Sequence, residues 1–168
     1  KKLRTFPNEM MRWQLEAMGF NVQIMPLPEV YLAIQQGAVS GQENPIDTIH
    51  ANKFYEVAPY VTLTQHVYSP IPMTISEKTW QRLSPADRQA VQRAAKEASD
   101  WSRKEVSSND DRLLADMQGK GAKIVRPNIG PWREAVVPVT KLARDKYGAD
   151  VDTILAEAEA IRKANPAK

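Results

Sequence analysis

The sequence contains no cysteine, so neither disulfide bonds nor thiolate chemistry can contribute to this chain. No stretch approaches the ~18 consecutive apolar residues that indicate a membrane-spanning helix. The net charge is only +3, and basic and acidic side chains alternate, so the basic stripe of a nucleic-acid-binding protein is missing. An apolar content of 42% and a charged content of 26% are typical of a globular protein, and 168 residues can bury one substantial core.

Motifs of the common enzyme classes are also missing. The two histidines, His50 and His66, are separated by 16 residues, which is not a metal-ligand spacing. There is no Gly-x-Ser-x-Gly, no glycine-rich phosphate loop and no His-Glu-x-x-His. Asp150-Val151-Asp152 lacks the glycine and the later glutamate of a calcium loop. We therefore expect no enzymatic activity, no metal and no cofactor.

The first half of the sequence alternates between strand-like and helix-like segments, several of them ended by glycine or opened by proline. In residues 60–68 the apolar side chains recur at every second position, which is typical of a strand. Strands separated by helices of this length predict an α/β fold with much parallel pairing. The expected strands are 2–6, 21–25, 60–68 and 71–75, and the expected helices are 8–18, 28–36 and 44–51.

The second half is predicted to be mainly helical. Ser84-Pro85-Ala86-Asp87 is a capping-box start, and no glycine or proline follows until Gly119. One helix over that span would be about 50 Å long, although the polar run 107–110 leaves open two helices with a short joint. A strand is expected at 122–125 and helices at 131–147 and 151–164, the first kinked or shortened by Pro138 and the second capped by Asp150 or Asp152.

Two polar residues from distant parts of the sequence are candidates for a binding site. Arg4 stands alone in the run Leu3-Arg4-Thr5-Phe6-Pro7, and Asn44 lies 40 positions later in Gly41-Gln42-Glu43-Asn44-Pro45. A guanidinium matches a carboxylate with two parallel hydrogen bonds, and an asparagine amide can add another. The alternative is that Arg4 is a surface residue and Asn44 a helix N-cap. The residues alone leave both interpretations open.

Four blocks of the sequence resemble the solute-binding subunits of TRAP (tripartite ATP-independent periplasmic) transporters. The similarity runs in order from residue 1 to about residue 100, and it weakens to a shared helical pattern beyond that. The blocks are Lys2-Leu3-Arg4, the stretch Leu32-Ala33-Ile34-Gln35-Gln36-Gly37-Ala38-Val39-Ser40-Gly41-Gln42-Glu43-Asn44-Pro45, Asn52-Lys53-Phe54-Tyr55-Glu56-Val57 and Leu63-Thr64-Gln65-His66-Val67-Tyr68-Ser69-Pro70.

The resemblance assigns roles to four residues. It implies that Arg4 pairs with the ligand carboxylate and that Asn44 binds the ligand or positions the arginine. His66 corresponds to a histidine near the pocket, either as part of its wall or in direct contact with the ligand. Leu27 stands where many relatives carry an aromatic residue that packs on the ligand, so a relative's ligand preference does not transfer directly.

Two acidic residues, Glu29 and Glu43, also match the family. A carboxylate beside an anionic ligand would oppose binding, so both are expected to be structural hydrogen-bonding groups rather than ligand contacts.

The resemblance also implies the fold and the biological setting. Family members are about twice as long, so we expect the C-terminal half of a two-lobed periplasmic-binding-protein fold, an α/β structure with a mixed sheet, flanking helices and one long helix along both lobes. Residues 1–69 would belong to the ligand-binding lobe, 70–109 to the other lobe, and 110–168 would return to the first. The expected partners are a small organic acid and the TRAP membrane permease subunits, in the bacterial periplasm.

The ligand itself stays open at this point, because relatives bind dicarboxylates, sugar acids, sialic acids, keto acids and hydroxylated zwitterions. An alternative for the isolated chain is a non-binding structural domain that self-associates into a homo-oligomer, for instance by exchange of the long helix.

Overall fold

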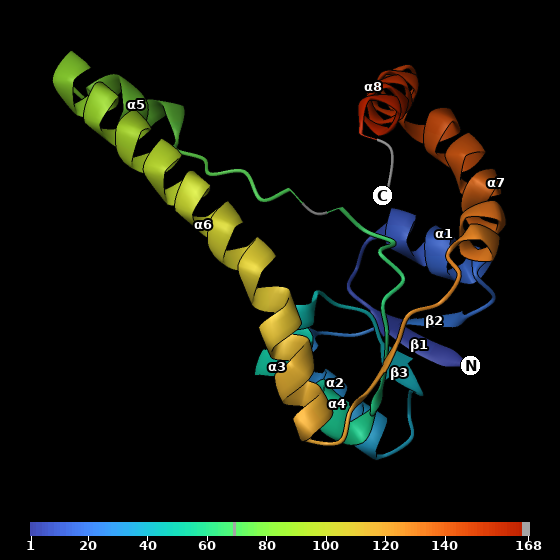
Figure 1. Ribbon diagram of the computed structural model, residues 1–168. Coiled ribbons are helices and arrows are strands. Elements are labelled where there is room, and N and C mark those ends of the chain that lie inside the picture. Colours follow the sequence, from blue (N-terminus) through green and yellow to red (C-terminus); the bar gives the residue numbers. More distant parts are fainter. Residues whose placement is uncertain (69, 166–168) are drawn as a thin grey trace.

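The computed structural model describes residues 1–68 and 70–165 of the chain, and a small parallel sheet lies at its centre (Figure 1). Strand β1 (Lys2–Thr5) lies between β2 (Asn21–Ile24) and β3 (Gly41–Gln42), and both pairings are parallel. The carboxyl ends of the three strands therefore meet at one edge of the sheet, which is the usual location of ligand sites in parallel α/β folds.

One face of the sheet is covered by helix α1 (Glu9–Ala17), as Figure 1 shows. The helix starts as the sequence predicts, because the side chain of Asn8 accepts a hydrogen bond from the backbone N–H of Met11. It ends before Gly19, whose φ of 86° is a conformation that glycine adopts without steric cost. Met11 and Leu15 are buried.

The opposite face carries four short helical segments and the main core. These segments are η1 (Leu27–Glu29), α2 (Val30–Gln35), α3 (Ile46–Ala51) and α4 (Phe54–Val57). Their buried side chains form one apolar cluster with the end of a later helix, and apolar burial of this kind is the main favourable term in folding. The largest contributions come from Val30, Ile34, Ile49, Phe54, Tyr55, Leu114 and Met117.

A second pair of strands lies beside this core. Strand β4 (Tyr60–Thr62) pairs in parallel with β5 (Lys123–Val125), and the chain leaves this pair toward α5 (Glu77–Arg82). The predicted strand over 60–68 is thus shorter than expected, and the strand expected at 71–75 is not present. Pro70 and Pro72 lack the N–H that a strand interior donates, and the described residues around them offer no neighbouring strand.

Helix α6 (Pro85–Gly119) confirms the expectation of one long helix (Figure 1). Ser84 caps it by accepting from the N–H of Asp87, and the helix continues through 107–110, so the alternative of two helices is wrong. Exposed pairs at i, i+4 spacing, such as Lys96 with Asp100, support its polar middle. Its C-terminal part is anchored in the core, whereas its first half extends away from the sheet.

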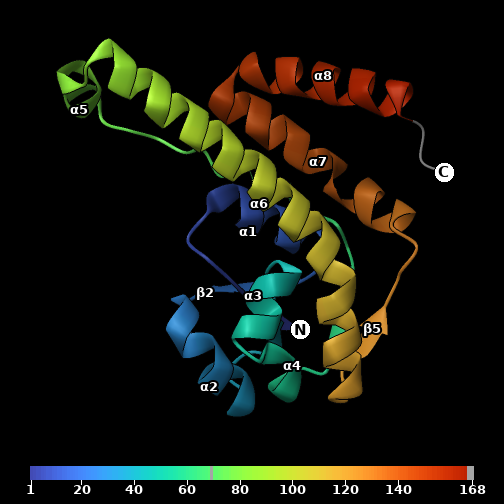
Figure 2. The ribbon, with the colours of Figure 1, turned by 60° about the vertical axis from the view of Figure 1, so that its left-hand side comes forward.

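The chain ends in two helices that lie on the α1 side of the sheet (Figure 2). Helix α7 (Gly130–Tyr147) packs on α1, and α8 (Asp150–Ala164) packs on α7. Helix α7 continues through Pro138 and is not shortened by it. The residue at the N-cap of α8 is Ala149, without a side-chain cap, so the expected cap by Asp150 or Asp152 is wrong.

Candidate functional site

Arg4 occupies the centre of the site, near the carboxyl end of the central strand. Its residue is only 2% exposed, so the alternative that Arg4 is a surface residue is wrong. Nε donates to the carbonyl of Met25 at 2.9 Å, and among the described residues this is the only hydrogen bond that the Arg4 side chain makes. Burial lowers the pKa of its guanidinium, while the negative charge of Glu43 opposes that shift. The N–H groups of the two terminal guanidinium nitrogens remain available to another acceptor.

Asn44 follows the neighbouring strand β3, and its amide donates to the side chain of Gln42. Helix α3 has Pro45 at its N-cap with no side-chain cap, so the role of Asn44 as an N-cap is wrong. Gln42 lies opposite Arg4 in the parallel register. Because side chains alternate along a strand, Arg4, Gln42 and Asn44 are placed toward the same face of the sheet.

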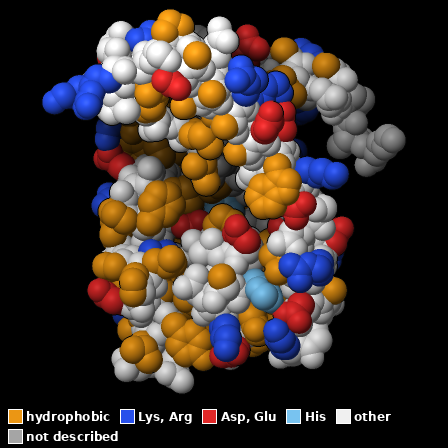
Figure 3. Space-filling model, turned by 90° about the vertical axis from the view of Figure 1, so that its left-hand side faces the viewer, with side chains coloured by type: hydrophobic (Ala, Val, Ile, Leu, Met, Phe, Trp, Pro, Cys, Tyr) orange, Lys and Arg blue, Asp and Glu red, His pale blue; other side chains and the backbone are white. Residues whose placement is uncertain are grey.

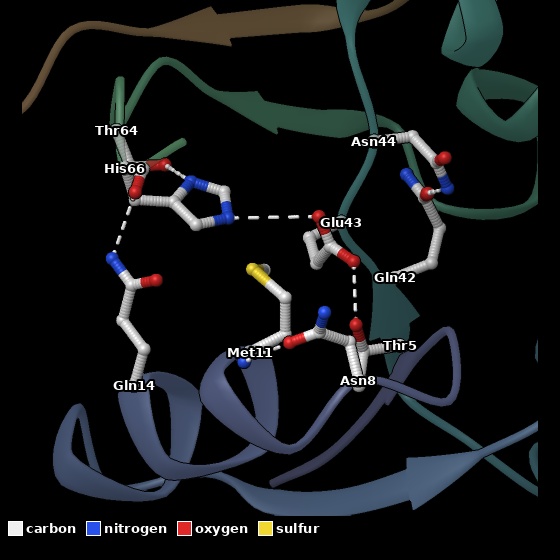
Figure 4. Close-up of polar contacts among 9 residues, drawn as sticks. All are labelled: Thr5, Asn8, Met11, Gln14, Gln42, Glu43, Asn44, Thr64 and His66. Atoms are coloured by element: carbon white, nitrogen blue, oxygen red, sulfur yellow. Dashed lines mark hydrogen bonds and ion pairs between the residues drawn. The ribbon is translucent and has the colours of Figure 1, made fainter. Parts of the chain in front are cut away.

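Glu43, which lies between Gln42 and Asn44, points to the other face of the sheet. Glu43 is held by Thr5, whose hydroxyl donates to Oε1 at 2.6 Å, and its Oε2 lies 3.6 Å from Nε2 of His66 (Figure 4). The side chains of Glu43 and His66 are largely buried, with 10% and 17% of their surfaces exposed, respectively. The interpretation of Glu43 as a structural hydrogen-bonding acid agrees with these contacts.

His66 is fixed by two further contacts. Its Nδ1 lies 2.7 Å from the hydroxyl of Thr64, and its backbone carbonyl accepts a hydrogen bond from Gln14 of helix α1 at 2.8 Å (Figure 4). Nε2 is buried without a hydrogen-bond partner in the described part of the chain. A buried polar atom of this kind ordinarily finds a partner, and Oε2 of Glu43 faces Nε2 at 3.6 Å.

The remaining two residues lie beyond the end of β2. Leu27 begins η1 and packs against the main core, so it provides an apolar wall. Glu29 is exposed, and its carboxylate accepts no hydrogen bond from the described residues. The expectation that Glu29 is a structural hydrogen-bonding acid is therefore wrong.

Sequence reasoning did not single out Thr5, Gln14 or Gln42 as partners in this site. Thr5 follows Arg4 in the sequence, and Gln42 lies two positions before Asn44. Their closeness to expected site residues could have identified both. Gln14 lies on a helix 52 residues from its partner His66, and only the fold brings the two together.

Two hollows of the structure lie away from these residues. One of about 190 Å³ is lined by Asp47 of α3 and by α6 residues including Trp101 and Asp110. Another of about 250 Å³ lies between α1, α7 and α8 and is mostly apolar. Neither is lined by Arg4, Asn44, Leu27 or His66.

The described residues contain no group of acidic, histidine or cysteine side chains that could hold a metal ion. None of the helices in the described ranges is long and apolar enough to cross a membrane. A parallel sheet with an arginine and side-chain amides at its carboxyl edge is an arrangement that suits small anionic ligands.

Residues 1–146 match the family model described as bacterial extracellular solute-binding protein, family 7, and the chain belongs to this family. The sialic acid-binding periplasmic protein SiaP of Vibrio cholerae is 36% identical over 132 residues, which are 79% of this chain and 41% of that protein.

Two solved structures are similar as well. A TRAP periplasmic solute-binding protein from a Polaromonas species, bound to D-erythronate, is 33% identical with a TM-score of 0.81, over 89% of this chain and 50% of that one. The ectoine-binding protein of the TeaABC TRAP transporter of Halomonas elongata is 29% identical with a TM-score of 0.89, over 98% and 55%.

These similarities confirm the resemblance, the fold class and the periplasmic class of protein. Because the relatives are binding proteins for transport, the expectation of a non-enzymatic family is also confirmed. The chain spans about half the length of the relatives it matches.

Proposed function

We propose that this chain is the C-terminal half of a periplasmic solute-binding protein that captures a small organic acid and delivers it to the membrane permease subunits of a TRAP transporter. The observation that carries the proposal is Arg4, which is 2% exposed and whose guanidinium makes one hydrogen bond to the described residues. A buried guanidinium is costly unless an anion satisfies it, and its planar fork matches a carboxylate.

Three other residues complete this side of the site in the proposal. Asn44 adds an amide on the same face as Arg4, Leu27 supplies the apolar wall, and His66 supports the end of β3 through its contact with Glu43. The D-erythronate and sialic acid of the two relatives are both hydroxylated carboxylates, which supports this ligand class for the present chain.

The location of Arg4 at one edge of the sheet supports a second, opposing wall. We assign residues 1–69 and 110–168 to the ligand-binding lobe and 70–109 to part of the other lobe, and sequence outside this chain would supply the rest of both lobes. Ligand bound between Arg4 and the opposite wall would favour the closed form, because only the closed form contacts it from both sides.

Replacing Arg4 in the full-length protein tests the proposal. We expect Arg4→Ala to abolish binding of D-erythronate and sialic acid in isothermal titration calorimetry, with the circular dichroism spectrum unchanged. Arg4→Lys should also weaken binding strongly, because a point charge loses the two parallel hydrogen bonds.

The matched control is Arg93→Ala, which removes an exposed arginine of α6 and should bind like the wild type. An Arg4→Ala protein that keeps its affinity within about threefold would exclude a bidentate carboxylate contact at this residue, since such contacts are among the strongest polar ones.

A further inference from the structure

We infer that Gln42 is a positioning residue of this site, which holds the side-chain amide of Asn44 in the orientation that binds the ligand. This inference rests on the proposed function, because Asn44 is one of the proposed ligand contacts. It adds a residue that acts through Asn44 and that need not touch the ligand itself.

The contact that carries the inference joins the two amide side chains. Nδ2 of Asn44 donates to Oε1 of Gln42, and among the described residues this is the only hydrogen bond that the Asn44 side chain makes. Helix α3 has no side-chain cap, so the helix does not hold the Asn44 amide either. With Nδ2 engaged by Gln42, the other end of the amide, Oδ1, is left to accept a hydrogen bond from a ligand.

The register of the sheet places Gln42 beside the proposed carboxylate site. Gln42 is the partner of Arg4 in the parallel pairing of β1 with β3. Partners on neighbouring strands share a face of the sheet, and so do residues two positions apart on one strand. Figure 4 shows Gln42 and Asn44 together on one side of this segment and Glu43 on the other, so the contacts of Glu43 do not hold the Asn44 amide.

The polar atoms that this arrangement leaves without a protein partner are accessible. Nε2 of His66 is the only fully buried side-chain nitrogen or oxygen without a partner in the described ranges. The terminal nitrogens of Arg4 and Oδ1 of Asn44 also lack partners there, so they are not fully buried. A ligand can therefore meet both groups without displacing a protein contact. An amide that is already held loses less side-chain freedom on binding, which is worth roughly three- to tenfold in affinity.

A double-mutant cycle in the full-length protein tests the inference. The ligand is D-erythronate or sialic acid, whichever the wild type binds more tightly in isothermal titration calorimetry. Gln42→Met keeps the length of the side chain and removes the acceptor, and should weaken binding by about three- to tenfold. In an Asn44→Ala background there is no amide to hold, so the same change should alter the affinity by less than about twofold. Gln42→Ala, a second variant without the acceptor, should give the same pattern, and circular dichroism checks that each variant is folded.

Gln23→Met is the matched control. Gln23 is the partner of Arg4 on the opposite neighbour, β2, and its amide donates to Asn21 and not to Asn44. The same chemical change on this side of Arg4 should leave the affinity within about twofold of the wild type.

Two results would overturn the positioning role and leave the proposed function standing. One is an unchanged affinity in both Gln42 variants. The other is an equal loss with and without the Asn44 amide, which would show that Gln42 acts independently of Asn44. If the folded wild type bound neither acid, or if Arg4→Ala bound as tightly as the wild type, the proposed function itself would fall and this inference with it.

Discussion

Thr5 is the residue on which the geometry of the site depends most directly. It is 0% exposed, and its hydroxyl is the donor that Glu43 meets at 2.6 Å. It also follows Arg4 immediately, so any shift of this strand end moves the arginine as well. The buried hydrogen bond therefore links the stability of the chain to the arrangement of the site.

Thr5→Val should lower the free energy of unfolding of this chain by roughly 1–3 kcal/mol, because a largely buried carboxylate oxygen loses its donor while the shape is kept. Urea denaturation followed by circular dichroism measures the difference. Thr5→Ser is the control, since it keeps the hydroxyl and loses one methyl group, and it should be the less destabilised variant. Equal losses for the two variants would mean that packing, and not the hydrogen bond, holds this position.

At this scale the sequence predicted some features of the site and missed others for a physical reason. The burial of Arg4 agrees with its apolar neighbours in the sequence, and the resemblance singled out Asn44, His66 and Leu27, whose roles in binding stay predictions. The contact between Thr5 and Glu43 joins residues 38 positions apart. It depends on the register of two parallel strands, which single-residue properties do not encode.

Helix α6 is the element that connects the core to the distant part of the chain. Two contacts join it to α3: His50 Nε2 lies 2.7 Å from the carboxylate of Asp116, and Asp110 lies near Asp47. The first contact is favourable, and the hydrogen bonds from Lys120 and His50 lower the pKa of Asp116. The second is unfavourable, because burial, together with the negative charges of Asp47 and Asp111, raises the pKa of Asp110.

Asp110→Asn should therefore stabilise the chain at pH 7. An acid whose pKa is raised in the folded state costs stability once the pH exceeds its unfolded value of about 4, and asparagine does not ionise. The gain should shrink as the pH falls toward 4, because the carboxyl of the folded wild type takes up its proton at a higher pH than that of the unfolded chain. Thermal unfolding at pH 7 and pH 4 measures both differences.

Glu97→Gln, at an exposed position of the same helix, is the control and should change stability little at either pH. A loss of stability in Asp110→Asn at pH 7 would show that the carboxylate is favourable where it lies, and that the repulsion from α3 does not dominate.

Elements with strong local signals were predicted correctly. The capping box at Ser84 and the absence of glycine and proline up to Gly119 predicted α6, and Asn8 with Gly19 bounded α1. The local pattern failed to predict the length of β4, because a strand needs a partner. The alternation in 60–68 continues past Thr62, but the partner strand β5 ends at Val125. Beyond Thr62 only one further backbone hydrogen bond, from Leu63, joins the two segments among the described residues. Pairing between distant segments decides strand length, and alternation alone does not.

On the scale of the whole molecule, the described chain leaves much apolar surface uncovered. Hydrophobic side chains gather around the hollow that crosses the middle of one face (Figure 3). In the extended segment before α5, Tyr68 and Ile71 are 92% and 91% exposed, and Met73 is also mostly exposed. Contiguous apolar patches of this kind mark interaction surfaces or aggregation sites.

We predict that this 168-residue chain, on its own, self-associates through that extended segment. Large exposed apolar side chains favour association with another copy when no other sequence covers them. Multi-angle light scattering over a range from roughly 10 to 500 µM should show a mass that rises with concentration, as expected for a weak interface.

The double variant Ile71→Ser/Met73→Ser should shift that mass toward the monomer, because it removes apolar area from the segment without touching the core. Ile154→Ser, at an exposed apolar residue of α8, is the control and should associate like the wild type. A monomer at the highest concentration would contradict the prediction. Association that persists in the double variant and is lost in the control would place the interface on α8 instead.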